Sequence, residues 1–372
     1  MTPDQIQSYS TKTQHSALDM EIANPVHRKI IDAIIQKAEQ ICPDSLALIG
    51  IYGSVATGDV HEKSDLDLLI LINDENGRKL SDAFLLDDSG IGYDIYCTDW
   101  NMLTEDAKCT HPHLAKLFDS RIVYVKDRSA LERLDRLKEQ AADLLTSGNR
   151  YGNTEKLIRS AKEAYADCCL AESVSDARVA AGCCIHILLE ALMLYHGKYF
   201  RLGIKRTFEE LCLPGLPSVM KEAVTAVIRS GSAEDIQHSL TRLYRLVSGH
   251  LRFPKERSKP SADNLCGTYE EMFSNWKNKM YEAADRDDVY ASFMNLLSLQ
   301  MMIHELAAEI ELEDMDIMKQ FDPADLSGNA ACFDHALEKY LTVYKKVDLQ
   351  VRRFANVDAF ITEYCSSSPA DT

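Results

Sequence analysis

The sequence predicts an α+β fold, with a mixed-sheet α/β domain at the N-terminus and a larger domain built only from helices behind it. Three observations support this prediction. Short apolar strands alternate with helical segments over roughly residues 20–125. Long amphipathic stretches with a helical period then replace the strands. The length of 372 residues allows two or more domains, each with its own core.

The elements of the N-terminal part can be placed from their start and stop signals. Asn24 is a good N-cap and Pro25 suits the first helical position, while Pro43 ends the apolar helical face that follows. The predicted strands span residues 46–53, 65–72, 92–98 and 121–125.

The remaining elements are predicted to be helical. Ser129 followed by Glu132 is a capping-box signal for a helix that ends before Gly148. Further helices are expected at 154–171, 176–196, 218–229, 233–250, 268–284, 287–313 and 328–347, with a charged, proline-containing linker at 252–264. We therefore expect four parts: a polar segment 1–24, an α/β domain 25–127, a helical bundle 128–255 and an additional helical region 265–372.

Composition limits the classes of function. The formal net charge of −17 argues against nucleic acid as a partner, because proteins that bind a phosphate backbone present lysine and arginine. The polar N-terminus and the lack of a run of eighteen apolar residues predict neither secretion nor a membrane span. Eleven cysteines without zinc-finger spacing suit reduced thiols, so we expect a cytoplasmic protein.

One short stretch, GSVATGDVHEKSDLDLLILI at residues 53–72, combines two chemical signals. Asp65 and Asp67 are two residues apart at the start of a strand, so their side chains share a face. Two neighbouring carboxylates repel each other unless a cation neutralises them, and magnesium prefers such oxygen ligands together with phosphate. Gly53 and Ser54 follow the preceding strand, where a glycine lets backbone N–H groups approach an anion. Together these residues predict a site for a nucleoside triphosphate and a divalent metal.

A third carboxylate, Asp94, lies in the apolar strand GYDIYC. A buried aspartate there is costly unless it has a partner. If this strand lies beside the one that carries Asp65 and Asp67, the three carboxylates converge and can hold two metal ions. Asp94 would then hold the metal on the hydroxyl side and accept the proton of the attacking hydroxyl.

This arrangement resembles the polymerase-beta-type nucleotidyltransferases, and most closely the small bacterial members that modify aminoglycosides and lincosamides. The resemblance covers about residues 45–100, with Gly53 and Ser54 at the phosphate-binding pair, Asp65 and Asp67 at the metal pair and Asp94 at the third acid. It implies a two-metal Mg²⁺ site and the transfer of AMP from ATP to a hydroxyl of a small acceptor, with release of pyrophosphate. Related enzymes also bring a basic residue from the helical domain to the triphosphate, and Lys205 is the candidate here.

Several alternatives stay open. The acceptor is either a small molecule, such as a cationic antibiotic, or a partner protein that receives AMP, as in an antitoxin-type regulator; a nucleotide sensor is disfavoured by the intact carboxylates. A glutamate of the helical part, Glu163 or Glu190, is a candidate general base by the same resemblance. Residues 265–372 either widen the substrate cleft or form a homodimer interface.

Two groups of loop residues complete the candidates. The stretch THPH at 110–113 brings two histidines close together, and we interpret it as a loop before a helix in preference to a metal pair. His61 and Glu62 lie in the loop between Ser54 and the two aspartates, where they are either solvated or in contact with the nucleotide.

Overall fold

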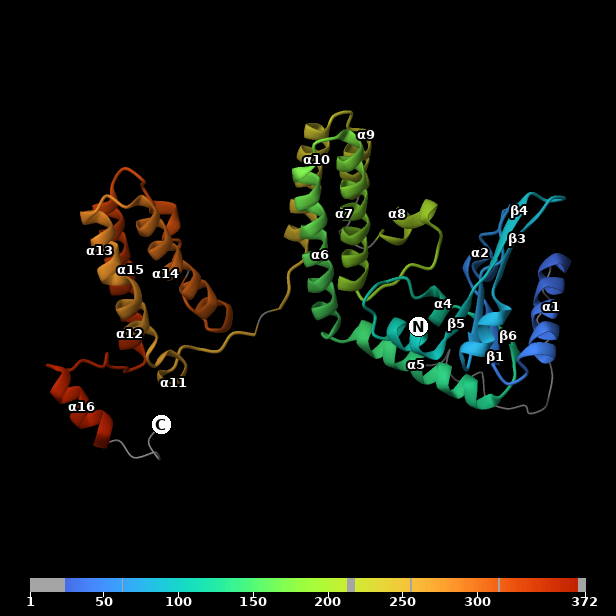
Figure 1. Ribbon diagram of the computed structural model, residues 1–372, viewed down its shortest axis with the longest axis horizontal. Helices are drawn as coiled ribbons and strands as arrows, with labels where there is room; N and C mark the ends of the chain where they lie inside the picture. Colours follow the sequence, from blue (N-terminus) through green and yellow to red (C-terminus); the bar gives the residue numbers. More distant parts are fainter. Residues whose placement is uncertain (1–23, 62, 213–217, 255, 314, 367–372) are drawn as a thin grey trace. The chain divides into compact units, whose positions relative to one another are not determined.

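The computed structural model describes residues 24–61, 63–212, 218–254, 256–313 and 315–366 (Figure 1). The chain forms two compact units, Met1–Phe253 and Pro254–Thr372. The boundary falls within the charged stretch 252–264. The expected polar segment 1–24 lies, apart from Asn24, outside the described residues.

A four-stranded mixed sheet in the order β5-β2-β1-β6 lies in the first unit. In it β1 (Leu46–Ile51) runs antiparallel to β2 (Leu68–Ile72) and to β6 (Arg121–Val125), and β5 (Cys97–Asp99) runs parallel to β2. A separate hairpin joins β3 (Asp82–Leu86) and β4 (Ile91–Ile95). The predicted N-terminal domain with a mixed sheet is confirmed.

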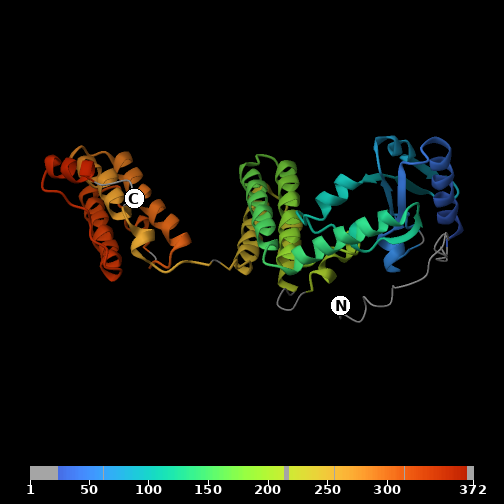
Figure 2. The same cartoon turned by 90° about the horizontal axis from the view of Figure 1, so that it is seen from below.

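The two faces of the sheet pack against different helices. On one face, Leu68 and Ile70 share a core with Ile31 and Ile34 of α1 (Pro25–Ile41). On the other face, Leu69 shares a core with the buried side of α3 (Trp100–Asp106) and α5 (Arg128–Thr146). Figures 1 and 2 show α1 and α5 on opposite sides of the sheet. Alternate residues of β2 therefore face the two different cores.

The first helix agrees with its sequence signals, whereas the start of α5 differs. The Asn24 side chain accepts a hydrogen bond from the Val26 N–H, as expected for an N-cap. The prediction that α5 begins at Ser129 is wrong, because the Asp127 side chain accepts the Ser129 N–H and the helix begins at Arg128. An aspartate two residues upstream is an equally good cap.

Strand boundaries also differ from the prediction. The second strand begins at Leu68 and not at residue 65, because its partner β1 ends at Ile51; only the hydrogen bond from the Tyr52 N–H to the Asp67 carbonyl extends the pairing. The predicted strand 92–98 divides into β4 and β5. The sequence analysis missed β3 because most of its side chains are exposed, which leaves no apolar run to detect.

Four long helices complete the first unit and confirm its predicted helical part: α6 (Arg150–Leu170), α7 (Val174–Tyr195), α9 (Ser218–Arg229) and α10 (Ala233–His250). Shorter turns connect the elements: α2 (Gly53–Thr57), η3 (Glu75–Leu80), α4 (Ala115–Phe118), η4 (Ile204–Arg206) and α8 (Thr207–Glu210). By length and composition α7 could cross a membrane. This is weak evidence for a membrane span, because the core helix of a soluble protein has the same length and composition. In the structure α7 supplies the buried centre of this bundle.

The second unit is helical throughout its described elements. They are α11 (Ala262–Leu265), α12 (Thr268–Met272), η5 (Phe273–Lys277), α13 (Asn278–Asp285), α14 (Val289–Glu309), η6 (Met318–Gln320), α15 (Leu326–Lys346) and α16 (Val357–Ser366). Its core is built around Phe333, Tyr340 and Tyr344 of α15. The Tyr344 hydroxyl donates to the Leu265 carbonyl and accepts the Tyr269 N–H, which ties α15 to the first helices of this unit.

Candidate functional site

A cavity of about 560 Å³ lies in the first unit, where β1 ends and β2 begins. Three segments line it: the turn after β1 with the loop that leads into β2, His113 with the first residues of α4, and the segment Phe200–Lys205, which ends within η4. Of the predicted site residues, the cavity lining includes Gly53, Ser54, Asp65, Asp67 and Lys205. Gly53 and Lys205, which are 152 positions apart in the sequence, therefore share one cavity.

Gly53 is required by the close approach of the backbone to Asp67. Its φ of +67° lies in the left-handed region, which disfavours residues with a Cβ atom. A Cβ added at Gly53 would in addition overlap the Asp67 carboxylate. The sequence analysis predicted that the backbone at Gly53 approaches a bound anion. In the structure it packs against the carboxylate of Asp67.

The Asp67 carboxylate is held in an unfavourable setting for a charge. Its burial and the neighbouring negative charge of Asp65 raise the pKa of Asp67, and these effects outweigh the hydrogen bond from the Ser54 backbone N–H, which lowers it. The Ser54 N–H thus donates to Asp67, whereas the sequence analysis assigned it to a bound anion. A raised carboxylate pKa beside a second carboxylate indicates a site that a cation would stabilise.

Asp94 lies on β4 of the separate hairpin, outside the cavity lining. In the parallel pair of β2 and β5, Ile70 is opposite Cys97, and the residues three positions before these are Asp67 and Asp94. Asp94 is exposed on β4, yet its charge contributes to raising the pKa of Tyr52. That pKa is about 12, chiefly through burial and then through Asp67, with smaller contributions from Asp106, Asp65 and Asp94.

The three predicted acids do not form a closed cluster. Within the part of the chain that the structure describes, they are not among the residue groups whose ligand atoms all lie within 4.8 Å of one another. The chain turns away from the central sheet at β4, which pairs with β3 instead, so that Asp94 faces solvent. Asp65 and Asp67 are thus the pair that the cavity presents.

The segment opposite the aspartates is basic, and its two cations are held differently. Arg201 makes a two-pronged ion pair with Asp119, with Nη2 at 3.1 Å from Oδ1 and Nε at 3.2 Å from Oδ2. The nearest acid to Lys205 is Asp59, whose Oδ2 is 3.8 Å from Nζ, and the lysine side chain is 58% exposed. Lys205 is therefore the more available cation for a ligand in the cavity.

The sequence analysis missed two further basic residues of the lining, Lys63 and Lys116. Lys116 lies 3.4 Å from Asp106 through its Nζ atom. Lys63 precedes Asp65 by two residues, and this short separation could have predicted that it lies at the site. His61 also lines the cavity, and Glu62 lies outside the described residues.

The structure distinguishes the two glutamates proposed as general bases. Glu163 is exposed on α6 and is not part of the cavity lining. Glu190 of α7 is buried, and its Oε1 lies 2.6 Å from Nε2 of His113, which lines the cavity. The THPH stretch is a loop before α4, as expected, but His113 has a carboxylate partner that the sequence did not reveal.

The donor set of the pair Asp65 and Asp67 fits a hard divalent cation. Both residues offer carboxylate oxygens at the wall of a cavity, and the raised pKa of Asp67 shows that their charge is incompletely compensated. Magnesium binds one or two carboxylates and fills its remaining positions with phosphate oxygens and water. The basic residues across the cavity are of the kind that holds such phosphates.

The match to a family model agrees with this geometry. Residues 28–143 match the model of the nucleotidyltransferase domain family. Among solved structures, the chain is similar to a nucleotidyltransferase-like protein from Exiguobacterium sibiricum 255-15, with a TM-score of 0.34 and 12% identity over 75% of this chain and 89% of that one. No curated protein matches the chain.

Proposed function

Since residues 28–143 belong to the nucleotidyltransferase domain family, we propose that this enzyme transfers AMP from Mg-ATP to a hydroxyl group of a small molecule and releases pyrophosphate. One observation carries the proposal: the backbone at Gly53 closes on Asp67, beside Asp65, in a cavity that also contains Lys205. A carboxylate pair and an exposed cation across one cavity are suited to a metal-bound triphosphate.

Asp65 and Asp67 would hold the magnesium ion, which when bound neutralises charge on the triphosphate and on the attacking oxygen. The chain's own residues supply position. The contact with Gly53 and the Ser54 N–H fix the Asp67 carboxylate. Lys205 would attract the phosphates from the opposite side, because an ammonium group on a flexible stem adapts to their oxygens.

The size of the cavity favours a small acceptor over a partner protein. A volume of about 560 Å³ is within the range of pockets that enclose small ligands, whereas a protein acceptor needs a broad exposed surface. The formal net charge of −17 favours a cationic acceptor such as an aminoglycoside, because a negatively charged surface concentrates cations. AMP transfer to a partner protein is the alternative that the experiment must test.

The test is magnesium-dependent release of pyrophosphate from ATP in the presence of aminoglycosides, lincosamides and other hydroxyl compounds, with mass spectrometry for the added AMP. Asp67→Asn is the inactive variant, and Asp87→Asn, in the exposed turn between β3 and β4, is its matched control. A product made by wild type and Asp87→Asn but absent with Asp67→Asn supports the proposal. If AMP is transferred only to a co-purifying protein, the acceptor class is wrong.

A further inference from the structure

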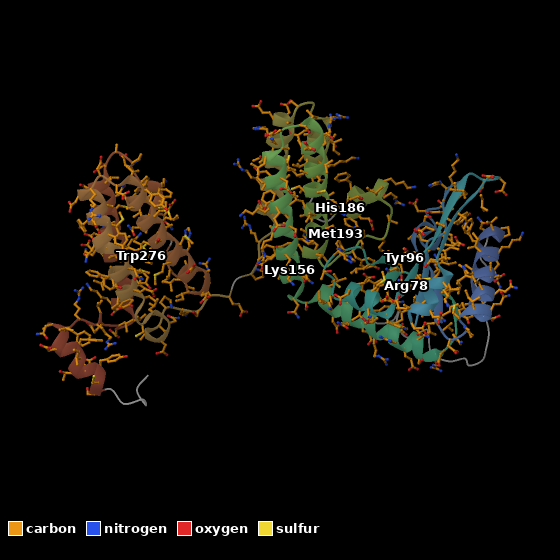
Figure 3. The ribbon with its side chains drawn as sticks, in the orientation of Figure 1. Arg78, Tyr96, Lys156, His186, Met193 and Trp276 are labelled. Atoms are coloured by element: carbon orange, nitrogen blue, oxygen red, sulfur yellow. The ribbon has the colours of Figure 1, made fainter. Side chains whose placement is uncertain are left out.

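A second group of metal-binding side chains lies beside the cavity. Among the described residues, one set of three histidine, cysteine or acidic side chains brings its ligand atoms within 4.8 Å of one another: His113, His186 and Glu190. His186 and Glu190 are one turn apart on α7, and His113 comes from the loop before α4. Figure 3 shows His186 projecting from α7. The proposed function does not use this set.

Both histidines face the same carboxylate oxygen. Nε2 of His113 lies 2.6 Å from Glu190 Oε1, and Nε2 of His186 lies 3.2 Å from the same atom. The two imidazole rings lie nearly parallel, with centroids 5.4 Å apart, and the ring of His113 also stacks on Phe200. Three donor atoms from two separate elements therefore converge on one point.

The negative charge of Glu190 has no lysine or arginine to balance it among the described residues. Glu190 is 7% exposed. A buried carboxylate is costly without an opposing charge. A divalent cation bound among the three groups would accept a lone pair from each imidazole and balance the charge of the carboxylate.

We propose that His113, His186 and Glu190 bind one late first-row divalent cation of the Zn²⁺ class, at the wall of the cavity. Imidazole with one carboxylate is a donor set typical of zinc, whereas magnesium prefers oxygen ligands alone. The set thus differs in metal class from the pair Asp65 and Asp67. Three protein ligands leave a fourth position free, which is the arrangement of catalytic and not of structural zinc sites.

The two distances between the histidines and Glu190 require little adjustment. Tetrahedral coordination at usual zinc bond lengths sets donor atoms roughly 3.3 Å apart. The His186 to Glu190 distance of 3.2 Å already matches this spacing, and the His113 distance of 2.6 Å needs less than an ångström of opening. Both histidine side chains are about half exposed or more, so they can rotate and a cation can reach them from solvent.

The experiment is titration of the untagged, full-length, metal-stripped protein with Zn²⁺ against a chromophoric chelator, in millimolar Mg²⁺, followed by Co²⁺ as a spectroscopic probe. Wild type should bind one equivalent and give visible Co²⁺ bands. His113→Ala and His186→Ala should each lose affinity by about 100-fold or more, because even outer-shell changes cost 10- to 100-fold. His238→Ala, which removes an exposed histidine of α10, should bind like wild type.

Asp67→Asn separates this proposal from the proposed function, since the variant should keep zinc affinity whether or not the enzyme transfers AMP. Circular dichroism of each variant checks that the helices remain folded. The proposal is overturned if folded wild type binds no stoichiometric zinc. It is equally overturned if removal of His113 or His186 changes the affinity no more than removal of His238.

Discussion

The two sides of the cavity are built in different ways. On the sheet side, Asp67 is partly buried and its position is set by the backbone of Gly53 and Ser54. On the opposite side, Lys205 is mostly exposed and reaches its nearest acid, Asp59, only at 3.8 Å. Asp67 is therefore positioned by main-chain contacts, whereas Lys205 is held only by a weak contact between two side chains.

This difference predicts unequal costs of mutation. A carboxylate fixed by the backbone has no substitute nearby, so its loss should abolish activity. An exposed lysine acts as a point charge in a cavity that also contains Lys63, Lys116 and Arg201, so its loss should be partly compensated. Four experiments test this contrast.

The largest effect is expected from Asp67→Asn. The substitution keeps the size of the side chain and an acceptor for the Ser54 N–H, but removes the negative charge that would hold the metal. We expect kcat to fall on the order of 100-fold or more, since metal stabilisation of the transition state contributes several kcal/mol. Steady-state rates of pyrophosphate release, with Asp87→Asn as control, measure it; equal losses in both variants would refute a specific role for Asp67.

The next effect is expected at Gly53, with Gly58 as a matched control. Both glycines have a positive φ, at +67° and +77°, so alanine should cost each about 1–2 kcal/mol of backbone strain. Only at Gly53 would the new Cβ meet Asp67, whereas nothing lies within 4 Å of a Cβ at Gly58. That overlap should cost about a further 1–3 kcal/mol or displace the carboxylate.

Urea unfolding and activity assays distinguish these two results for the glycine pair. Gly53→Ala should lose most activity because Asp67 moves, and Gly58→Ala should keep it despite its strain. If both variants lose activity equally, the backbone turn matters more than the contact with Asp67.

The sequence predicted that Gly53, Asp65 and Asp67 lie together, for a physical reason. The contact between the Gly53 backbone and Asp67, beside Asp65, is formed by residues within one short stretch. A local motif is therefore enough to predict it. The fold of the first domain was equally accessible because the buried strands β1 and β2 are continuous apolar runs.

The other residues of the site depend on contacts that a local motif does not contain. Asp94 was placed on the correct strand, but the turn of β4 toward the missed strand β3 decides where its side chain lies. The partnership of His113 with Glu190 spans 77 residues, and neither stretch alone reveals it. Lys63 enters the cavity from a loop and Lys116 from the four-residue helix α4, and neither segment is long enough to give a periodic signal.

A smaller effect is expected on the basic side. Lys205→Ala should raise KM for ATP by about tenfold or less, because an exposed cation contributes at most roughly 1.4 kcal/mol to phosphate binding. Lys198→Ala is the control, since this exposed lysine lies seven residues before Lys205 but outside the cavity lining. If Lys205→Ala lowered activity as much as Asp67→Asn does, the sheet side and the basic side of the cavity would not differ in their contribution.

The smallest effect concerns stability and pH in the absence of metal. The raised pKa of Asp67 means that folding favours its protonated form, so the free energy of unfolding should fall as pH rises from the unfolded value near 3.9 through the folded pKa. Asparagine does not titrate. Asp67→Asn should therefore match wild type at the acidic end of this window and become the more stable protein above it, by on the order of 1 kcal/mol.

Urea unfolding of both proteins across this pH range, with chelator present, measures the difference. Added magnesium should stabilise wild type but not the variant, because binding to the native state adds RT ln(1 + [L]/Kd) only where the site is intact. A stability difference independent of pH would mean that the Asp67 charge is already compensated by the chain. The sheet side would then be no more strained than the basic side.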